Sequence, residues 1–194
     1  MVYLGRNAIK AAIQDGSIVA VCGSGQPLPD SRIQLVSVDV TLGEYFAAPS
    51  RDVEVDVYNT PKSGWALTRA DKRTGIIIPP RCFLLAHTDE FIGSAVSDIN
   101  CQLQTRSTAA RWGMDVCRAA GWGDPGYVGR WTLELQNALD VPLRLLPGTR
   151  IGQITFFRVE NPDTKELYHS DYNSTLSTWT PECMLPKNLV QEGL

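Results

Sequence analysis

The feature that most constrains this chain is a succession of short apolar runs, each bounded by turn-forming residues. Runs rich in Val, Ile, Thr and aromatic residues favour β-strands, because branched and flat side chains pack well on a pleated surface. The predicted strands span residues 17–22, 36–42, 53–58, 75–80, 82–88, 99–105, 130–137, 142–146 and 150–159. Many short strands at this spacing predict a mainly β fold, either a sandwich or a barrel.

Two short helices are predicted between these runs. Apolar residues from Ala8 to Ile13 recur at helical spacing, and the run ends at Gly16, a common residue just past a helix C-terminus. A turn or two of helix is expected over residues 107–112, with Ser107 capping its start.

The length and composition indicate one domain followed by a tail. With 194 residues and 43% hydrophobic content, the chain can bury one sizeable core. The strand pattern dissolves after about residue 160, where polar residues and scattered aromatic residues follow one another. We therefore expect a nucleotide-binding domain over residues 1–160 and a C-terminal tail over 161–194, serving as a lid or as a subunit-crossing arm.

The charges nearly balance, with 18 Lys and Arg against 21 Asp and Glu. A nucleic-acid partner normally requires a strongly basic surface, so the composition indicates none. No apolar run is long enough for a signal peptide or a membrane span, which predicts a soluble protein of the cytoplasm, or of the host cytoplasm for a viral source. The five cysteines are odd in number and widely spaced, which argues against a disulfide framework.

A zinc-dependent base deaminase is not indicated. Such enzymes need a His or Cys near a catalytic Glu, followed by a Cys-x-x-Cys pair. This sequence has no Cys-x-x-Cys, and its two histidines, His87 and His169, lie far apart. We expect no metal site built by the protein itself, so any hydrolytic chemistry must activate water without a transition metal.

The segment from Arg106 to Val159 places an RSTAAR loop, an Asp, a Tyr and a Glu in a fixed order among predicted strands. This segment resembles the dCTP deaminase branch of the dUTPase-like superfamily. The initial helix, VSVDVTLGEYF and IIIPPRCFLLAHTDEFI also occur in the family's order, so the resemblance covers roughly residues 1–160. It implies a dUTPase-like distorted jelly roll, a homotrimer with active sites between neighbouring subunits, and a deoxycytidine nucleotide as substrate.

Glu134 is the candidate catalytic residue for deamination. Replacing the 4-amino group of cytosine requires a group that takes a proton from water and passes protons on, and one carboxylate with a shifted pKa can serve throughout. Glu134 is the only carboxylate in RWTLELQN, where alternation puts it on the face opposite Leu133 and Leu135. The resemblance adds Arg111, which dCTP deaminases carry where dUTPases have a small residue. Arg111 would hold the water or stabilise the carboxylate, or else form an ordinary surface ion pair.

Triphosphate binding is expected at the start of the second predicted helix. Arg106 supplies a planar charged fork, and Ser107 and Thr108 add hydroxyl and backbone N–H groups suited to phosphate oxygens. Gln153 resembles the family's strand glutamine that contacts phosphate or base. We expect Mg²⁺ to bind mainly through the substrate triphosphate, leaving little trace in the protein.

The segment GWGDPGYVGRW also resembles the part of dUTPases in which an Asp positions the attacking water and an aromatic residue lies near the base. Asp124 and Tyr127 occupy those places, and Ala120 and Gly121 match the pair found in bifunctional enzymes that proceed to dUMP. This predicts space beside Asp124 for a second hydrolytic step. The alternative is that Asp124 only forms a turn with the Pro-Gly that follows it.

Three functions therefore remain open: a nucleotide deaminase using Glu134, a dUTPase alone, and a non-catalytic trimer that senses nucleotides or regulates a partner. The chain departs from the family where Ala119 and Ala120 replace a Thr-Ala pair, and where Gly123 replaces an apolar residue. Because of these departures, a nucleotide with a modified cytosine and a nucleoside monophosphate remain alternative substrates. No counterpart of the family's lid residues is assigned in the tail.

Overall fold

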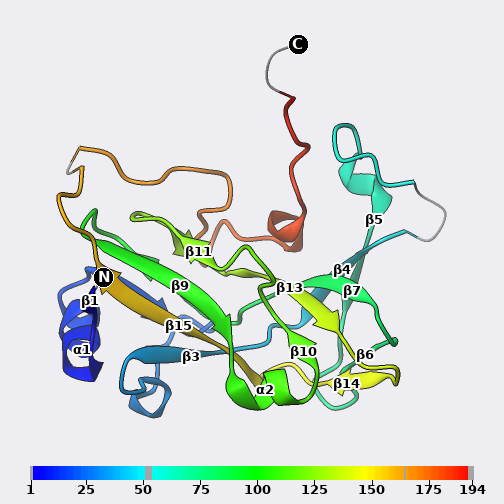
Figure 1. Cartoon of the computed structure of the whole chain (residues 1–194), viewed down its shortest axis with the longest axis horizontal. Coiled ribbons are helices and arrows are strands. Elements are labelled where there is room, and N and C mark those ends of the chain that lie inside the picture. Colours follow the sequence, from blue (N-terminus) through cyan, green and yellow to red (C-terminus); the bar gives the residue numbers. More distant parts are fainter. Residues whose placement is uncertain (1, 51–53, 164, 192–194) are drawn as a thin grey trace.

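A computed structural model describes residues 2–50, 54–163 and 165–191, which form a mainly β structure (Figure 1). The described helices are α1 (Arg6–Gln14), α2 (Ser107–Arg111) and single 3-10 turns at Asp30–Arg32, Lys62–Gly64 and Pro181–Met184. None of these helices is long and apolar enough to cross a membrane. The predicted first helix is confirmed, with Ile9 and Ala12 buried and Gly16 following the C-cap at a φ of 83°.

The sheet that carries the chain's longest strand is centred on β15 (Arg150–Arg158). One edge of β15 pairs with β9 (Ile99–Thr105), which pairs in turn with β11 (Trp122–Gly123). Along its other edge, β3 (Ser37–Thr41) pairs with the first half of β15, and β1 (Val2–Tyr3) pairs with its end. All these pairings are antiparallel.

The sheet that carries Glu134 is built around β13 (Thr132–Asn137). Its order is β10 (Met114–Asp115), β13, β7 (Phe83–His87), β4 (Tyr45–Pro49) and β5 (Trp65–Arg69). Two smaller sheets complete the described fold. One contains β12 (Val128–Gly129), β8 (Phe91–Ser94) and β2 (Ile18–Val21), and the other pairs β14 (Leu143–Leu145) with β6 (Ile76–Ile78).

The two larger sheets enclose one hydrophobic core. Leu103 from β9 and Phe156 from β15 belong to the same buried cluster as Leu133 and Leu135 from β13. Alternation along β13 buries these leucines and leaves Thr132, Glu134 and Gln136 half-buried on the opposite face, as the sequence predicts. The fold is therefore the predicted jelly-roll-like β-sandwich, whose sheets do not close into a barrel.

A buried carboxylate joins the sheets where β7 leads into β8. Glu90 is 1% exposed, and its Oε1 accepts hydrogen bonds from the Arg32 guanidinium and from the Thr41 hydroxyl. Its Oε2 accepts the Thr41 backbone N–H at 2.8 Å. Two residues earlier, the Thr88 hydroxyl accepts the Trp131 backbone N–H at 2.9 Å, just before β13 begins. This junction fixes β3 and β13 relative to each other.

The predicted strand over residues 53–58 is wrong. Residues 54–56 have no regular structure and residues 57–59 form a turn, while residue 53 lies outside the described residues. The Asp56 carboxylate accepts the Tyr58 backbone N–H at 2.9 Å, and the Asp56 carbonyl accepts the Thr60 hydroxyl. Val55 and Val57 are 46% and 49% exposed, so no sheet face uses the alternation. Hydrogen bonds between local side chains and the backbone stabilise a turn here, in place of the backbone pairing of a β-sheet.

The predicted cap at Ser107 is also wrong. Helix α2 begins at Ser107 itself, and the N-cap position belongs to Arg106, whose side chain makes no capping bond. The Arg106 backbone N–H still donates to Ile151 on β15 at 3.0 Å, so the strand pairing extends one residue further than the sequence indicates. Strands β4, β5 and β8 are not predicted, because YFAAP, WALTR and FIGS lack alternation and contain Pro, Gly or small residues.

The tail is mostly irregular, as predicted, and it folds back over the domain. In Figure 1 it runs in orange and red above β11 and β13. The Tyr168 backbone N–H donates to Pro125, the Asn173 amide donates to Gly126, and the Ser174 backbone N–H donates to Val128. Further along, Met184 and Leu185 are buried against Ala47 and Leu85. The tail thus lies along the loop that carries Asp124.

Candidate active site

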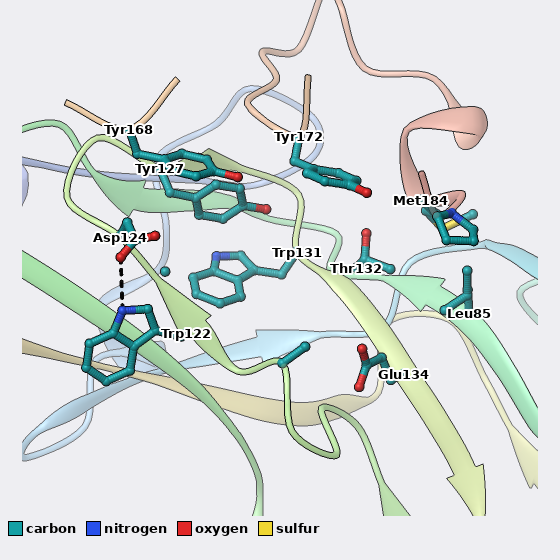
Figure 2. A pocket seen from close by; sticks show the side chains of 13 residues that line it. Leu85, Trp122, Asp124, Tyr127, Trp131, Thr132, Glu134, Tyr168, Tyr172 and Met184 are labelled. Carbon is teal, nitrogen blue, oxygen red and sulfur yellow. Dashed lines mark hydrogen bonds between the residues drawn. The ribbon is translucent and has the colours of Figure 1, made fainter. Parts of the chain in front are cut away.

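A pocket of about 340 Å³ lies between β13, the loop from Ala120 to Tyr127, and the tail (Figure 2). Strand β13 contributes Thr132 and Glu134 to its wall, and the loop contributes Trp122, Asp124 and Tyr127. Four residues of the tail complete the lining: Tyr168, Tyr172, Met184 and Pro186. The pocket therefore combines two carboxylates with several aromatic side chains, an arrangement suited to a planar ligand with polar edges.

Glu134 is half-buried on the pocket face of β13, where its backbone pairs with Leu85. Burial raises the pKa of the Glu134 carboxyl above its ordinary value, and the negative charge of Asp115 adds to the rise. The positive charge of Arg118 and the Ala119 backbone N–H oppose it. A carboxylate with a raised pKa is a stronger base than a free one, which suits proton transfer.

Asp124 forms the predicted turn and also faces the pocket. Its carbonyl accepts the Tyr127 backbone N–H at 2.9 Å, and Gly126 within the turn has a φ of 97°, which favours glycine. Its carboxylate lines the pocket, and Oδ1 accepts a hydrogen bond from Trp122 Nε1 at 3.0 Å (Figure 2). A turn role and a chemical role for Asp124 are compatible in this geometry.

Tyr127 is held by aromatic neighbours on two sides. Its ring meets Trp131 edge-on at 5.0 Å and Tyr168 at 6.0 Å, measured between ring centroids. The Tyr127 hydroxyl donates to the Arg130 carbonyl at 3.4 Å, and burial raises the pKa of that hydroxyl. Tyr127 therefore stays neutral at ordinary pH and presents a flat, fixed surface to the pocket.

Ala120 and Gly121 have different environments. Ala120 is exposed and lines the pocket, where its small side chain leaves room. Gly121 is buried, and a Cβ added there would lie 2.3 Å from the Leu103 carbonyl oxygen of β9. The small side chain of Ala120 is thus compatible with the predicted space beside Asp124. The glycine at 121 instead permits the close approach of β9, whose Leu103 N–H donates to the Gly121 carbonyl at 2.7 Å.

The predicted phosphate-binding residues lie elsewhere in the protomer. Within the described residues, none of the following lines the pocket of Glu134: Arg106, Ser107, Thr108, Arg111 and Gln153. Ser107, Thr108 and Arg111 are exposed on α2. Within one chain, Arg118 is a cation that acts on the Glu134 carboxyl. The role predicted for Arg111 stays a prediction.

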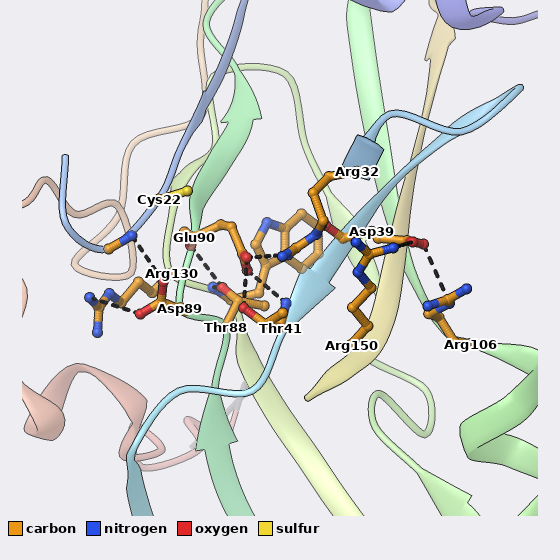
Figure 3. Close-up of polar contacts among 12 residues, drawn as sticks. Cys22, Arg32, Asp39, Thr41, Thr88, Asp89, Glu90, Arg106, Arg130 and Arg150 are labelled. Carbon is orange, nitrogen blue, oxygen red and sulfur yellow. Dashed lines mark hydrogen bonds and ion pairs between the residues drawn. The ribbon is translucent and has the colours of Figure 1, made fainter. Parts of the chain in front are cut away.

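Arg106 belongs to a second polar cluster around Asp39, shown in Figure 3. Asp39 is 1% exposed and pairs with Arg106 at 3.4 Å and with Arg150 at 3.5 Å. Gln153 lies opposite Asp39 in the register of β15 and β3. This cluster directs two guanidinium groups and the start of α2 to one surface, and guanidinium groups recognise phosphate oxygens well.

Several pocket residues are not predicted from the sequence. Trp122 and Thr132 lie within GWGDPGYVGRW and RWTLELQN but have no predicted role there, and Met184 lies outside these motifs. The tail tyrosines Tyr168 and Tyr172 lack a periodic pattern. In the described residues, no three His, Cys, Asp or Glu side chains gather to hold a metal ion.

Comparison with known proteins places this geometry in a family. A solved 2'-deoxycytidine 5'-triphosphate deaminase from Agrobacterium tumefaciens has the same fold, with a TM-score of 0.60 at 19% identity, and the match covers 82% of this chain and 47% of that longer chain. A family model described as dCTP deaminase-like matches residues 3–159. The chain belongs to the dCTP deaminase-like family, and the resemblance seen in its sequence is confirmed.

Curated relatives agree with this assignment. The protein from Beutenbergia cavernae named "dCTP deaminase, dUMP-forming" is 33% identical over 156 residues, which are 77% of this chain and 81% of the relative. A protein of the same name from Sulfurihydrogenibium sp. is 33% identical over 163 residues, which are 84% of this chain and 89% of the relative. The similarity thus extends over most of both chains.

The charge environment of Glu134 leads to a test by titration. Because burial raises its pKa in the folded protein, protonated Glu134 stabilises the fold at low pH, and this contribution is lost as pH rises through the folded pKa. Arg118→Gln removes the opposing positive charge, so it should raise the pKa of Glu134 further. Carboxyl ¹³C NMR measures both values. Arg144→Gln, in the separate β14–β6 sheet, is the control, and a wild-type Glu134 pKa at or below its ordinary value contradicts the assignment.

Proposed function

We propose that this protein removes the 4-amino group of dCTP to give dUTP and ammonia, and then cleaves dUTP to dUMP and pyrophosphate. The observation that carries the first step is Glu134, a half-buried carboxylate with a raised pKa on the wall of a pocket lined by aromatic residues. The names of the curated relatives support both steps.

In the first step, Glu134 acts as the general base and then as the general acid. The carboxylate takes a proton from water while the water oxygen bonds to C4 of cytosine, and it delivers this proton to ring N3. It then takes the proton of the new C4 hydroxyl and passes it to the amino group, so that the C4–N bond breaks, the C4=O bond of uracil forms, and ammonia leaves. Such proton transfer by a positioned side chain contributes about 10²–10⁴ to the rate.

The neighbouring residues suit this substrate. Tyr127 and Trp131 offer flat apolar surfaces for a pyrimidine ring, and Ala120 leaves room at the rim. The tail closes the other side with Tyr168 and Tyr172, so we assign it the role of a lid. Exclusion of bulk water by such a lid strengthens the electrostatic interactions inside the pocket.

The triphosphate is bound by a second copy of the chain. One protomer holds its Arg106 cluster apart from its Glu134 pocket, so a complete site needs the two halves from different subunits. A homotrimer brings three such pairs together by cyclic symmetry. Arg106, Ser107, Thr108 and Gln153 then contact the phosphates, and Arg111 reaches the reaction centre of the neighbour. We assign Mg²⁺ to the phosphates of the substrate, which hold this hard cation together with water.

The second step uses Asp124. Its carboxylate faces the pocket and is oriented by the Trp122 N–H, which suits a group that aligns a water on the α-phosphate. Pyrophosphate is then the leaving group and dUMP remains. A dUTPase without deaminase activity is the alternative that this part of the pocket supports, and product analysis distinguishes the two.

The function is tested by incubating the protein with dCTP and Mg²⁺ and identifying the products by ion-exchange chromatography. Ammonia and dUMP are expected from the wild type. Glu134→Gln keeps the shape of the side chain but cannot take a proton, so deamination should fall by about 10²–10⁴ while nucleotide binding persists. Near-normal deamination by this variant would remove Glu134 from the mechanism, and activity on dUTP alone would favour the dUTPase.

The division of the site between subunits is tested by mixing two inactive variants. Arg111→Ala and Glu134→Gln should each be inactive as pure trimers. After unfolding together and refolding, random assembly gives about one quarter of the sites an intact residue of both kinds. Activity should return to a comparable fraction of wild type. A mixture that stays inactive, or a protein that is monomeric by light scattering at micromolar concentration, contradicts the proposal.

The role of Asp124 is tested by comparing the two products of each turnover. Asp124→Asn keeps the turn but removes the charge, so pyrophosphate release should fall more strongly than ammonia release, and dUTP should accumulate. Ser97→Ala, in the loop that precedes β9, serves as the control. If the wild type itself accumulates dUTP in step with ammonia, Asp124 is a turn residue and the enzyme stops after deamination.

A further inference from the structure

Trp179 is a half-buried residue of the tail that contacts aromatic and cationic side chains of the domain. Its ring centroid lies 4.4 Å from that of His87 on β7 and 6.0 Å from that of Tyr45 on β4. The Arg130 guanidinium carbon lies 4.5 Å from the same ring centroid. Trp179 does not line the pocket of Glu134, yet it follows Tyr168 and Tyr172, which do. Its contacts therefore need an explanation separate from ligand binding.

Arg130 is held mainly by aromatic faces. Its side chain is 13% exposed, its guanidinium carbon lies 5.0 Å from the Phe91 ring, and Trp179 covers the guanidinium as well. The ion pair with Asp89 is long, at 3.9 Å (Figure 3), and Arg130 Nε is buried without a hydrogen-bond partner. A cation deprived of water gains most from an aromatic face, so Trp179 contributes substantially to keeping Arg130 in place.

His87 provides the neutral surface beside this cation. The Tyr45 backbone N–H donates to Nε2 at 3.2 Å, so the ring proton sits on Nδ1 and is donated to the Thr88 carbonyl at 2.8 Å. Arg130 Nη1, at 3.4 Å from Nδ1, consequently has no acceptor there. Burial lowers the pKa of His87 to about 4, so the ring carries no charge that would repel Arg130.

The imidazole ring of His87 is closely packed on the side of Gly43. A Cβ added at Gly43 would lie 1.9 Å from Cε1 of the His87 ring, so the backbone of the β3–β4 connection rests against the imidazole. The Gly43 backbone N–H also donates to the His87 carbonyl at 2.7 Å. The surface that receives Trp179 is therefore rigid, and a rigid surface fixes the position of the ring that packs on it.

We propose that Trp179 is a positioning residue that latches the tail over the active-site pocket by stacking on Arg130 and His87, and so keeps Tyr168 and Tyr172 at the pocket wall. Arg130 lies just before β13, the strand that carries Glu134, so the latch ties the lid to the catalytic strand itself. The expected effect on kinetics rests on the proposed deamination of dCTP. The closure of the tail is independent of that function, because it can be measured without substrate.

The latch is tested first without substrate, by hydrogen exchange of the backbone N–H groups of Tyr168 and Ser174. Tyr168 donates to Pro125 in the loop that carries Asp124, and Ser174 donates to Val128 at the start of β12, so both report closure of the tail. In Trp179→Ala their protection should fall about tenfold or more, because the latch no longer opposes opening. Trp179→Phe, which keeps an aromatic face, should lie between this variant and the wild type. Leu176→Ala, at a 50% exposed position of the same tail, is the control and should match the wild type.

Arg130→Met tests the partner of the ring. It keeps the length of the side chain but removes the cation, so it should lower protection as Trp179→Ala does. The double variant should then show less than the combined effect of the two single changes, because both remove the same contact. Unchanged protection in Trp179→Ala and Trp179→Phe, or fully independent effects in the double variant, overturns the latch.

The kinetic readout separates positioning from a general loss of structure. For dCTP, Trp179→Ala should raise KM about tenfold, while the single-turnover rate at saturating substrate changes by no more than about threefold. A fall in that rate equal to the fall in kcat/KM would place Trp179 in the chemical step and overturn the positioning role. If the wild type does not deaminate dCTP, the proposed function fails, and hydrogen exchange still decides whether the latch exists.

Discussion

The buried carboxylate of Glu90 is the interaction on which the other parts of this structure depend. It accepts both the backbone N–H and the hydroxyl of Thr41 and is neutralised by Arg32, so the end of β3 is tied to the turn between β7 and β8. A buried carboxylate without such partners would cost several kcal/mol. The same turn receives the start of β13 through Thr88. The sheet of β3 and β15 and the strand that carries Glu134 therefore share one fixed junction.

Within one chain, the cluster around Asp39 and the pocket of Glu134 lie on different surfaces of the sandwich. Asp39 collects Arg106 and Arg150 on the sheet of β3 and β15, whereas Glu134 faces the tail from β13. A nucleotide needs a neutral flat surface for its base and dense positive charge for its phosphates, and one small sandwich presents these on separate surfaces. In the proposed homotrimer, neighbouring copies would join these two surfaces, and each active site would then depend on the concentration of the chain.

The sequence was sufficient for features that depend on periodicity or on local order. The alternation of β13 predicted that Glu134 faces away from Leu133 and Leu135, and the Asp-Pro-Gly sequence predicted the turn at Asp124. It was insufficient where a long-range partner decides the outcome. Val55 and Val57 alternate like a strand but have no sheet to join, and β5 pairs through WALTR without alternation. The contacts of Trp179 and Tyr172 belong to an irregular tail, where no period indicates which residues face inward.

The contact between Gly43 and His87 constrains how this lineage can change. An added Cβ at position 43 would lie 1.9 Å from the imidazole, far inside van der Waals contact, and the ring cannot move because both its nitrogens are engaged. A side chain larger than glycine at position 43 therefore requires His87 to shift or to be replaced by a smaller residue. Substitutions at these two positions are thus expected to depend on each other, although neither residue lines the pocket of Glu134.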